Sequence, residues 1–220
     1  MGKKRSYSGL TKGTSERLLL DAGAFFRNFT YEEGGTANDT FDAAVAAGKL
    51  IGATKGGGEF SAVPTVRQIE VDGVKGRAKG LEVIDSWEVY LKATVLETTT
   101  ETIRASLGAA TVDTASDEKY DVITGNAAIE LTDYIDNVTW VGTLSGSNEP
   151  VIIQVYNGLN TEGLKLTVQD KGEATLPMTF YGHYTQDDLD SPPFKILYPK
   201  KKQEGGGDAG KQGGGQESGA

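Results

Sequence analysis

Alternation of apolar and polar residues dominates both halves of the chain and predicts β-strands. The clearest run spans 87–95, where Trp87, Val89, Leu91, Ala93 and Val95 alternate with Glu88, Tyr90, Lys92 and Thr94. Other runs predict strands at 65–71, 138–144, 151–155, 163–170, 173–184 and 194–198. The pattern therefore indicates a mainly β fold.

Turn residues divide these runs. Asp170-Lys171-Gly172 predicts the turn of a hairpin, whereas Asn157-Gly158 and Asp72-Gly73 are expected to end the strands that precede them. Residues 18–29 are expected to form one bent strand or two short ones, with Gly23 at the bend. Pro177 lies on the polar side of its run, which places that strand near a sheet edge or at a bulge.

One helix is indicated after the strand at 87–95. Thr98-Thr99-Thr100-Glu101 predicts a capping box, and Gly108 is a suitable stop for the helix. Ile103 and Leu107 lie four residues apart and predict the buried face of a helix of about three turns. A weaker helix is possible at 41–47, where alanines are frequent.

The ends of the chain and one internal segment differ in composition from the rest. Residues 1–16 form a polar arm, 17–199 a β domain, and 200–220 a Gly-rich tail that we expect to be flexible. The segment 30–64 is too long for an ordinary connection, and we expect it to be an extended arm. Its glycines include Gly34, Gly35, Gly56, Gly57 and Gly58.

The net charge of the chain indicates which partners it can bind tightly. The chain carries 22 basic and 31 acidic residues, a net charge of −9, and both ends are basic, so the body is more acidic still. Tight binding of duplex DNA needs clustered Lys and Arg. Lys75, Arg77 and Lys79 are the one basic cluster in the body, and we expect them in an exposed hairpin or inter-subunit loop. No cysteine, signal peptide or apolar run long enough for a membrane span is visible.

Few residues could take part in catalysis or metal binding. His183 is the single histidine and is expected on the polar face of a strand, so common zinc sites are not predicted. Asp187, Asp188 and Asp190 do not have EF-hand spacing and predict a solvated loop. Gly56-Gly57-Gly58 does not fit a phosphate-binding pattern. We therefore expect no enzyme activity, no cofactor and no metal.

Two stretches carry a family resemblance. Residues 50–107 include LIGATKGGGEF and VRQIEVDGVKGRAKGLEVIDSWEVYLKATVLETTTETIRASL, and the body ends with LPMTFYGHYTQDDLDSPPFKILYPK. In its Gly-rich segment, Asp-Gly turn, long strand, short helix and final aromatic strand, the sequence resembles the major tail tube proteins of long-tailed, non-contractile phages.

The resemblance implies a β-sandwich or half-barrel flanked by one helix, with hexameric rings stacked into a tube. DNA would cross the lumen transiently and without sequence preference during ejection, and tape measure, tail terminator and distal tail proteins would be further partners. The subunit would be made in the bacterial cytoplasm, belong to the virion tail and touch no membrane. The arm at 30–64 would reach the neighbouring ring. An acidic wall lets DNA slide, so Glu70, Asp72 and Glu88 are candidates for the lumen.

A different function class stays open. A soluble β-sandwich binding module, of the carbohydrate-binding or adhesin kind, would need exposed aromatic residues as a platform. Tyr90, Tyr156 and Tyr181 are expected on outward faces and could supply one. A hydrolase on a β-scaffold is disfavoured, because the sequence shows no catalytic constellation.

Overall fold

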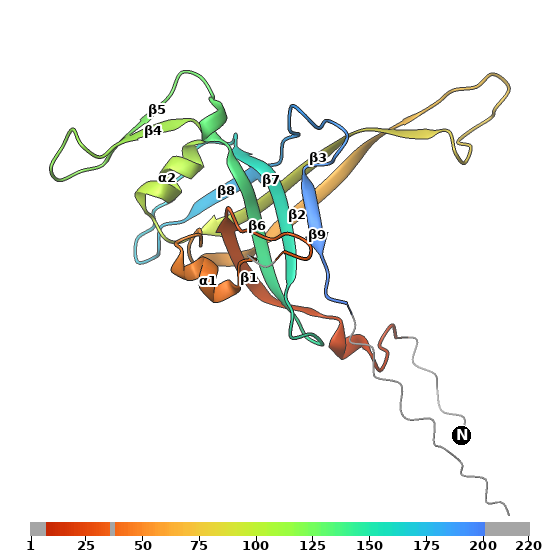
Figure 1. Cartoon of the computed structure of the whole chain (residues 1–220), viewed down its shortest axis with the longest axis horizontal. Coiled ribbons are helices and arrows are strands. Elements are labelled where there is room, and N and C mark those ends of the chain that lie inside the picture. The colour runs from red at the N-terminus through yellow and green to blue at the C-terminus, as the bar shows by residue number, and fades with distance from the viewer. Residues whose placement is uncertain (1–7, 36–37, 201–220) are drawn as a thin grey trace, which may run out of the picture.

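The structure is a computed structural model that describes residues 8–35 and 38–200, and it is mainly β, as predicted (Figure 1). The strands are β1 (Leu19–Arg27), β2 (Thr54–Gln68), β3 (Glu82–Val95), β4 (Ala110–Asp113), β5 (Val122–Gly125), β6 (Ile135–Leu144), β7 (Val151–Asn160), β8 (Leu176–Tyr181) and β9 (Phe194–Leu197). The α-helices are α1 (Phe41–Ala46) and α2 (Thr100–Leu107), with 3-10 turns at Thr14–Glu16 and Leu131–Asp133. In the described ranges no helix is long and apolar enough to cross a membrane.

A seven-stranded antiparallel sheet forms the body. Its strand order is β1-β6-β7-β8-β3-β2, and β9 pairs with the first half of β7. The two terminal strands of this order approach each other: the amide of Ile51, just before β2, donates to Phe25 O of β1 at 2.8 Å. The sheet is therefore nearly closed, as expected for a half-barrel.

The inner face of the sheet holds the main core. The predicted alternation in β3 is confirmed, because Val89, Leu91, Ala93 and Val95 are all buried. They pack in one cluster, whose other members come from four further strands: Phe25, Val138, Val155, Leu176, Met178 and Phe180. Period-two alternation thus places one face of each of these strands in a shared interior.

A second core lies on the opposite face of β1 and β7. Phe26 and Ile152 point away from the interior and pack with Phe29 and Ala44, the buried residue of α1. Thr40 caps α1, since its hydroxyl accepts from the Ala43 amide at 3.2 Å. The possible helix at 41–47 is confirmed. Both faces of β7 are therefore covered, which explains its nearly continuous burial.

The segment 30–64 is not one extended arm, and this prediction is wrong. Its first half folds back over the sheet through α1 and a bridge between Leu50 and Phe26. Its second half forms most of β2, which starts at Thr54 and not at the predicted Thr65. The polar, Gly-rich composition of the segment gave no sign of this fold, because only a few of its apolar side chains pack against the sheet. Deleting 34–58 would remove parts of both cores.

Two turn predictions have different outcomes. The turn at Asp170-Lys171-Gly172 is confirmed, with the Gly172 amide donating to Gln169 O, but residues 164–168 form no regular strand and meet 175 through one bridge only. Asn157-Gly158 does not end β7, contrary to prediction. Asn157 takes a φ of 49° inside the strand, and its side-chain amide donates to His183 O at 2.9 Å. The neighbouring segment thus stabilises a turn-forming residue within a strand.

The edge prediction for Pro177 is confirmed. Pro177 pairs with Thr94 of β3, whereas β7 reaches β8 only at Phe180 and Tyr181. Proline has no N–H to donate to a neighbouring strand, and on this side of Pro177 there is no described strand that would need one. The bend predicted in β1 is present too: Gly23 has a φ of 67°, and the register shifts between Leu20 and Ala24.

Helix α2 is capped and buried differently from the prediction. Thr99, not Thr98, is the N-cap, and Thr102 completes the capping box, so Glu101 is left to pair with Arg27. The buried face consists of Thr102 and Ser106, whose hydroxyls donate to backbone carbonyls within or just before the helix. These internal bonds allow polar residues to face the sheet.

The polar ends lie partly outside the description. The predicted N-terminal arm is described from Ser8, and its 3-10 turn is followed by a bond from the Leu18 amide to Ser145 Oγ at 3.1 Å. Of the predicted flexible tail, only Lys200 is within the described residues, so residues 201–220 lie outside them.

Candidate assembly surface

Strands β2 and β3 continue beyond the body as a projecting hairpin (Figure 1). Where the hairpin leaves the body, Trp87 packs on Phe194 of β9 with ring centroids 5.4 Å apart. Pairing then continues outward to Gln68 opposite Glu82. The hairpin therefore keeps its ladder where it no longer covers the core.

Apolar side chains on this hairpin are exposed. They are Val63, Val66, Ile69, Val71, Val74, Val83 and Ile84. Val66 and Ile84 are direct partners in the register, and Arg67 next to them forms an ion pair with Asp85 at 3.1 Å. So many exposed apolar side chains on one projecting element favour a protein–protein contact.

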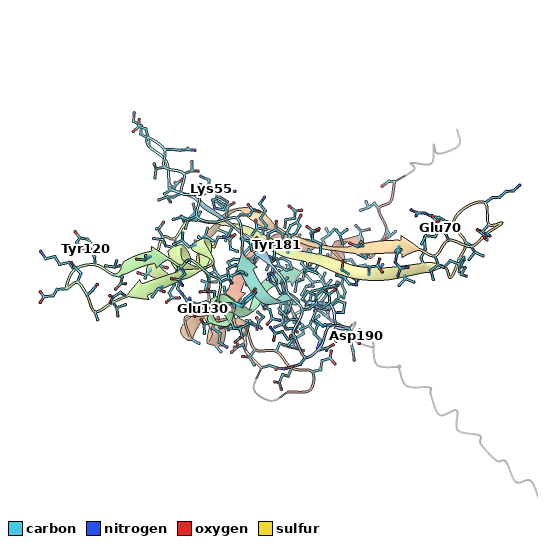
Figure 2. The ribbon with its side chains drawn as sticks, turned by 90° about the horizontal axis from the view of Figure 1, so that it is seen from above. Lys55, Glu70, Tyr120, Glu130, Tyr181 and Asp190 are labelled. Carbon is cyan, nitrogen blue, oxygen red and sulfur yellow. The ribbon has the colours of Figure 1, made fainter. Side chains whose placement is uncertain are left out.

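The tip of the hairpin, residues 69–81, gathers most of the predicted charged sites. Glu70, Asp72, Lys75, Arg77 and Lys79 all lie there and are exposed. Figure 2 places Glu70 at the far end of the hairpin. Glu88 is separate from them: it lies on β3 opposite Val63, nearer the body. The three lumen candidates therefore do not form one patch.

The sheet has open edges beside these side chains. Strand β2 is the last in the strand order, and among the described residues no strand pairs with its outer side from Glu59 to Gln68. At the other end of the order, Leu19 and Leu20 of β1 are exposed, and within 8–35 and 38–200 they pair only with β6. Open edges carrying apolar residues favour pairing with another chain.

The glycines predicted for an inter-ring arm lie in different settings. Gly56 and Gly57 have φ values of 82° and 75° and form the bulge between Thr54 and Gly58. Gly58 packs directly on the Phe25 ring. Gly35 closes a turn with Glu32, at 3.0 Å between amide and carbonyl. The structure therefore does not bring these glycines together.

The polar residues that could carry chemistry serve local structure. His183 is half-buried, with Nδ1 2.9 Å from Asn157 O and its ring against Tyr134, and not on an open strand face. Asp188 accepts bonds from the Ser191 and Asp190 amides, and the hydrogen bonds from Ser191 lower the pKa of its carboxyl group. Across residues 8–35 and 38–200, no three metal-ligating side chains gather at one point.

A cleft of about 540 Å³ lies beside α2. Its charged lining includes Arg27, which pairs with Glu101, and Arg104, whose guanidinium donates to the carbonyls of Ala110 and Thr132. These charged groups therefore hold the helix to neighbouring segments.

The three tyrosines considered as a platform are not brought together. Tyr90 and Tyr181 are cross-strand neighbours with ring centroids 5.8 Å apart, and their hydroxyls bond Glu59 at 2.8 Å and Glu162 at 3.5 Å. The hydrogen bond to Glu59 raises the pKa of Tyr90. The pKa of Tyr181 is raised mainly by burial and also by the nearby carboxylate of Glu162. Tyr156 lies elsewhere and donates to Gln154.

Sequence reasoning missed a second projecting hairpin, formed by β4 and β5. Its loop carries Tyr120, which is exposed and lies at one end of the molecule in Figure 2. The short apolar runs that could have revealed it are Ala110 to Val112 and Val122 to Ile123. Comparison of the chain with models of protein families and with curated proteins gives no match.

Proposed function

We propose that this protein is a structural subunit that assembles with copies of itself into sixfold rings stacked as a hollow tube, in the manner of siphophage tail tubes. DNA would pass through the lumen during ejection. The proposal rests on the sequence resemblance together with the surface of the β2–β3 hairpin.

One observation carries the proposal. The hairpin extends beyond the body with its strands paired from Pro64–Trp87 to Gln68–Glu82, apart from one register shift between Thr65 and Val66, yet it exposes Val66, Ile84 and other apolar side chains. Burial of apolar area contributes about 25 cal/mol per Å². A neighbouring copy offers the surface that this hairpin lacks in a single chain.

Sheet closure supports the same proposal. The strand order leaves β1 and β2 at the ends of the sheet, each with a stretch with which no other described strand pairs on its outer side. In a ring of copies, each open edge meets a neighbour, which removes the risk of uncontrolled edge pairing. The partners expected from the family resemblance, tape measure, terminator and distal tail proteins, would bind the ends or the interior of such a tube.

A binding module is the second candidate. Tyr90 and Tyr181 favour it, because they form an aromatic pair on neighbouring strands. Both hydroxyls already bond carboxylates, and Tyr156 is not part of the pair. A platform of two rings is small, so this candidate ranks below the structural subunit.

Sedimentation velocity over a hundredfold range of concentration separates the two. A tube subunit should shift from a small species to rings and larger polymers as the concentration rises. A binding module should stay at one sedimentation coefficient throughout, and that result would rule out the structural proposal.

A further inference from the structure

Two hairpins project from opposite ends of the molecule. In Figure 1 the β2–β3 tip lies at one end of the long axis and the β4–β5 hairpin at the other. Figure 2, seen from above, shows the same separation between Glu70 and Tyr120. A protein with distinct surfaces at its two ends can bind copies of itself head to tail.

The two ends have opposite charge. The β2–β3 tip, residues 69–81, carries the exposed basic cluster Lys75, Arg77 and Lys79 against Glu70 and Asp72. The β4–β5 hairpin, residues 110–125, carries mostly acidic side chains, with Lys119 as its basic residue. The acidic residues are Asp113, Asp117, Glu118 and Asp121. Opposite fields of this kind steer surfaces together and fix their register.

Much of this charge is not neutralised by ion pairs within the chain. In the described part of the chain, no carboxylate oxygen comes within 4.0 Å of the Lys75 or Lys79 ammonium, and Arg77 meets Glu82 only at 3.8 Å. On the acidic hairpin, Asp113 and Asp117 each accept hydrogen bonds from two backbone amides of their own loop, and Asp121 accepts one from the Thr100 hydroxyl at 2.9 Å; no Lys or Arg forms an ion pair with these carboxylates among the described residues. Both patches therefore retain charge for a partner.

Each charged patch also contains exposed apolar side chains. Val71 and Val74 lie in the basic tip, and Tyr120 and Val122 in the acidic hairpin. An apolar centre with a charged rim is the usual composition of a specific interface. Surface ion pairs alone would contribute little, so the apolar side chains give the contact most of its affinity.

We propose that the basic β2–β3 tip of one copy binds the acidic β4–β5 hairpin of the next copy. This contact is heterologous, so it closes a ring or extends a filament according to the rotation between copies. This pairing rests on the proposed function in one respect, namely that the chain associates with itself. Beyond that function, the pairing names the two surfaces that meet and predicts that their charges can be exchanged.

Charge exchange between two variants tests the contact. K75E/K79E makes both ends of the molecule acidic, and E118K/D121K makes both ends basic. Each variant alone should assemble about tenfold or more weakly than the unchanged protein in sedimentation velocity, because like charges then meet at every contact. An equimolar mixture should regain assembly, since every acidic tip can meet a basic hairpin and every basic tip an acidic one.

Matched controls carry the same changes in net charge elsewhere. K12E/K171E and D187K/D190K reverse exposed residues outside both patches and should assemble like the unchanged protein. Circular dichroism of all four variants verifies folding. If the unchanged protein assembles and the two patch variants assemble equally well, or the mixture regains nothing, the pairing of these hairpins is wrong while the proposed function stands. If the unchanged protein never assembles, both fail.

Discussion

Val66 of β2 lies directly opposite Ile84 of β3, and these two apolar side chains are 51% and 52% exposed. Inside the body the same two strands pair Phe60 with Leu91 and Ala62 with Val89, where Leu91 and Val89 are buried. The apolar pairing of the ladder therefore continues past the point where the chain's own core ends. That continuation is the physical basis for assigning the hairpin to self-assembly.

Replacing both members of this pair should weaken assembly without unfolding the subunit. V66T/I84T keeps β-branched side chains but exchanges one methyl group of Val66 and the ethyl group of Ile84 for hydroxyls. This is a loss of roughly three apolar carbons, or about 2.4 kcal/mol if all are buried in the contact, so the concentration for half-assembly should rise at least about tenfold. Thermal unfolding of the isolated subunit should change by less than about 0.5 kcal/mol. Val168→Thr, at an exposed site in the 163–170 segment, is the matched control. Unchanged assembly by V66T/I84T would remove the hairpin from the interface.

Gly58 should resist substitution. A methyl group there would collide with the Phe25 ring and with Lys92 O at 2.5 Å, and the site joins the two ends of the sheet. Gly58→Ala should therefore cost about 1–3 kcal/mol in the free energy of unfolding. Gly125→Ala in β5 meets nothing within 4 Å and should be nearly neutral. Equal stabilities of the two variants in urea unfolding would argue against closure of the sheet at Phe25.

The Asp39–Lys49 ion pair should make stability depend on pH. Burial tends to raise the pKa of Asp39, but bonds from Lys49 and Thr30 outweigh it and lower the pKa below its ordinary value of 3.8. A lowered carboxyl pKa stabilises the folded state above the unfolded pKa, and this stabilisation is lost as the pH falls through the folded pKa.

Asp39→Asn should therefore lower the melting temperature at pH 7, and the difference from the unchanged protein should shrink below about pH 4. Asp187→Asn, in an exposed loop, serves as the control. A difference that stays constant from pH 7 to pH 3 would show that the charge of Asp39 does not stabilise this segment.

Lumen-facing carboxylates would control the speed of DNA passage. Glu70, Asp72 and Glu88 remain the candidates, and because Glu88 lies apart from the tip, Glu70→Lys and Glu88→Lys should be made separately. A lysine on the wall attracts phosphates at every repeat of the tube, so ejection should slow, most at low salt, where screening is weakest. Fluorescent-dye ejection assays on assembled particles measure this. If neither variant changes the rate at low salt, these positions lie outside the lumen.

Truncation after Pro199 should leave folding and assembly intact. The removed residues are almost entirely Gly, Gln, Lys, Glu, Ser and Ala, and they contain too little apolar surface to contribute to a core. Soluble expression and the sedimentation profile of the truncated chain provide the check. Loss of either would assign the tail a structural role.

The sequence predicted those parts of the fold in which one face is buried and the other polar. The runs containing Val89 and Met178 show this alternation, so their strands were found. The extent of β2 could not be predicted, because the bulge at Gly56-Gly57 interrupts its pattern. The buried face of α2 was missed because the hydroxyls of Thr102 and Ser106 donate to backbone carbonyls within or just before the helix, which allows these polar residues to be buried.

The candidate surface was predictable only in part. The basic cluster at Lys75 stands out from charge alone, and its exposed hairpin position follows from the glycines around it. The β4–β5 hairpin did not stand out, since its strands are only four residues long and mostly exposed. Its significance depends on its position at the opposite end of the molecule, which only the three-dimensional arrangement provides.

Electron microscopy of the concentrated, full-length protein tests self-assembly most directly. Negatively stained fields should contain rings and stacks of rings, and class averages of end-on views should show sixfold symmetry around a hollow centre. The same fields of V66T/I84T should contain mainly single subunits. Fields of the unchanged protein that show only single subunits at every concentration would contradict the account.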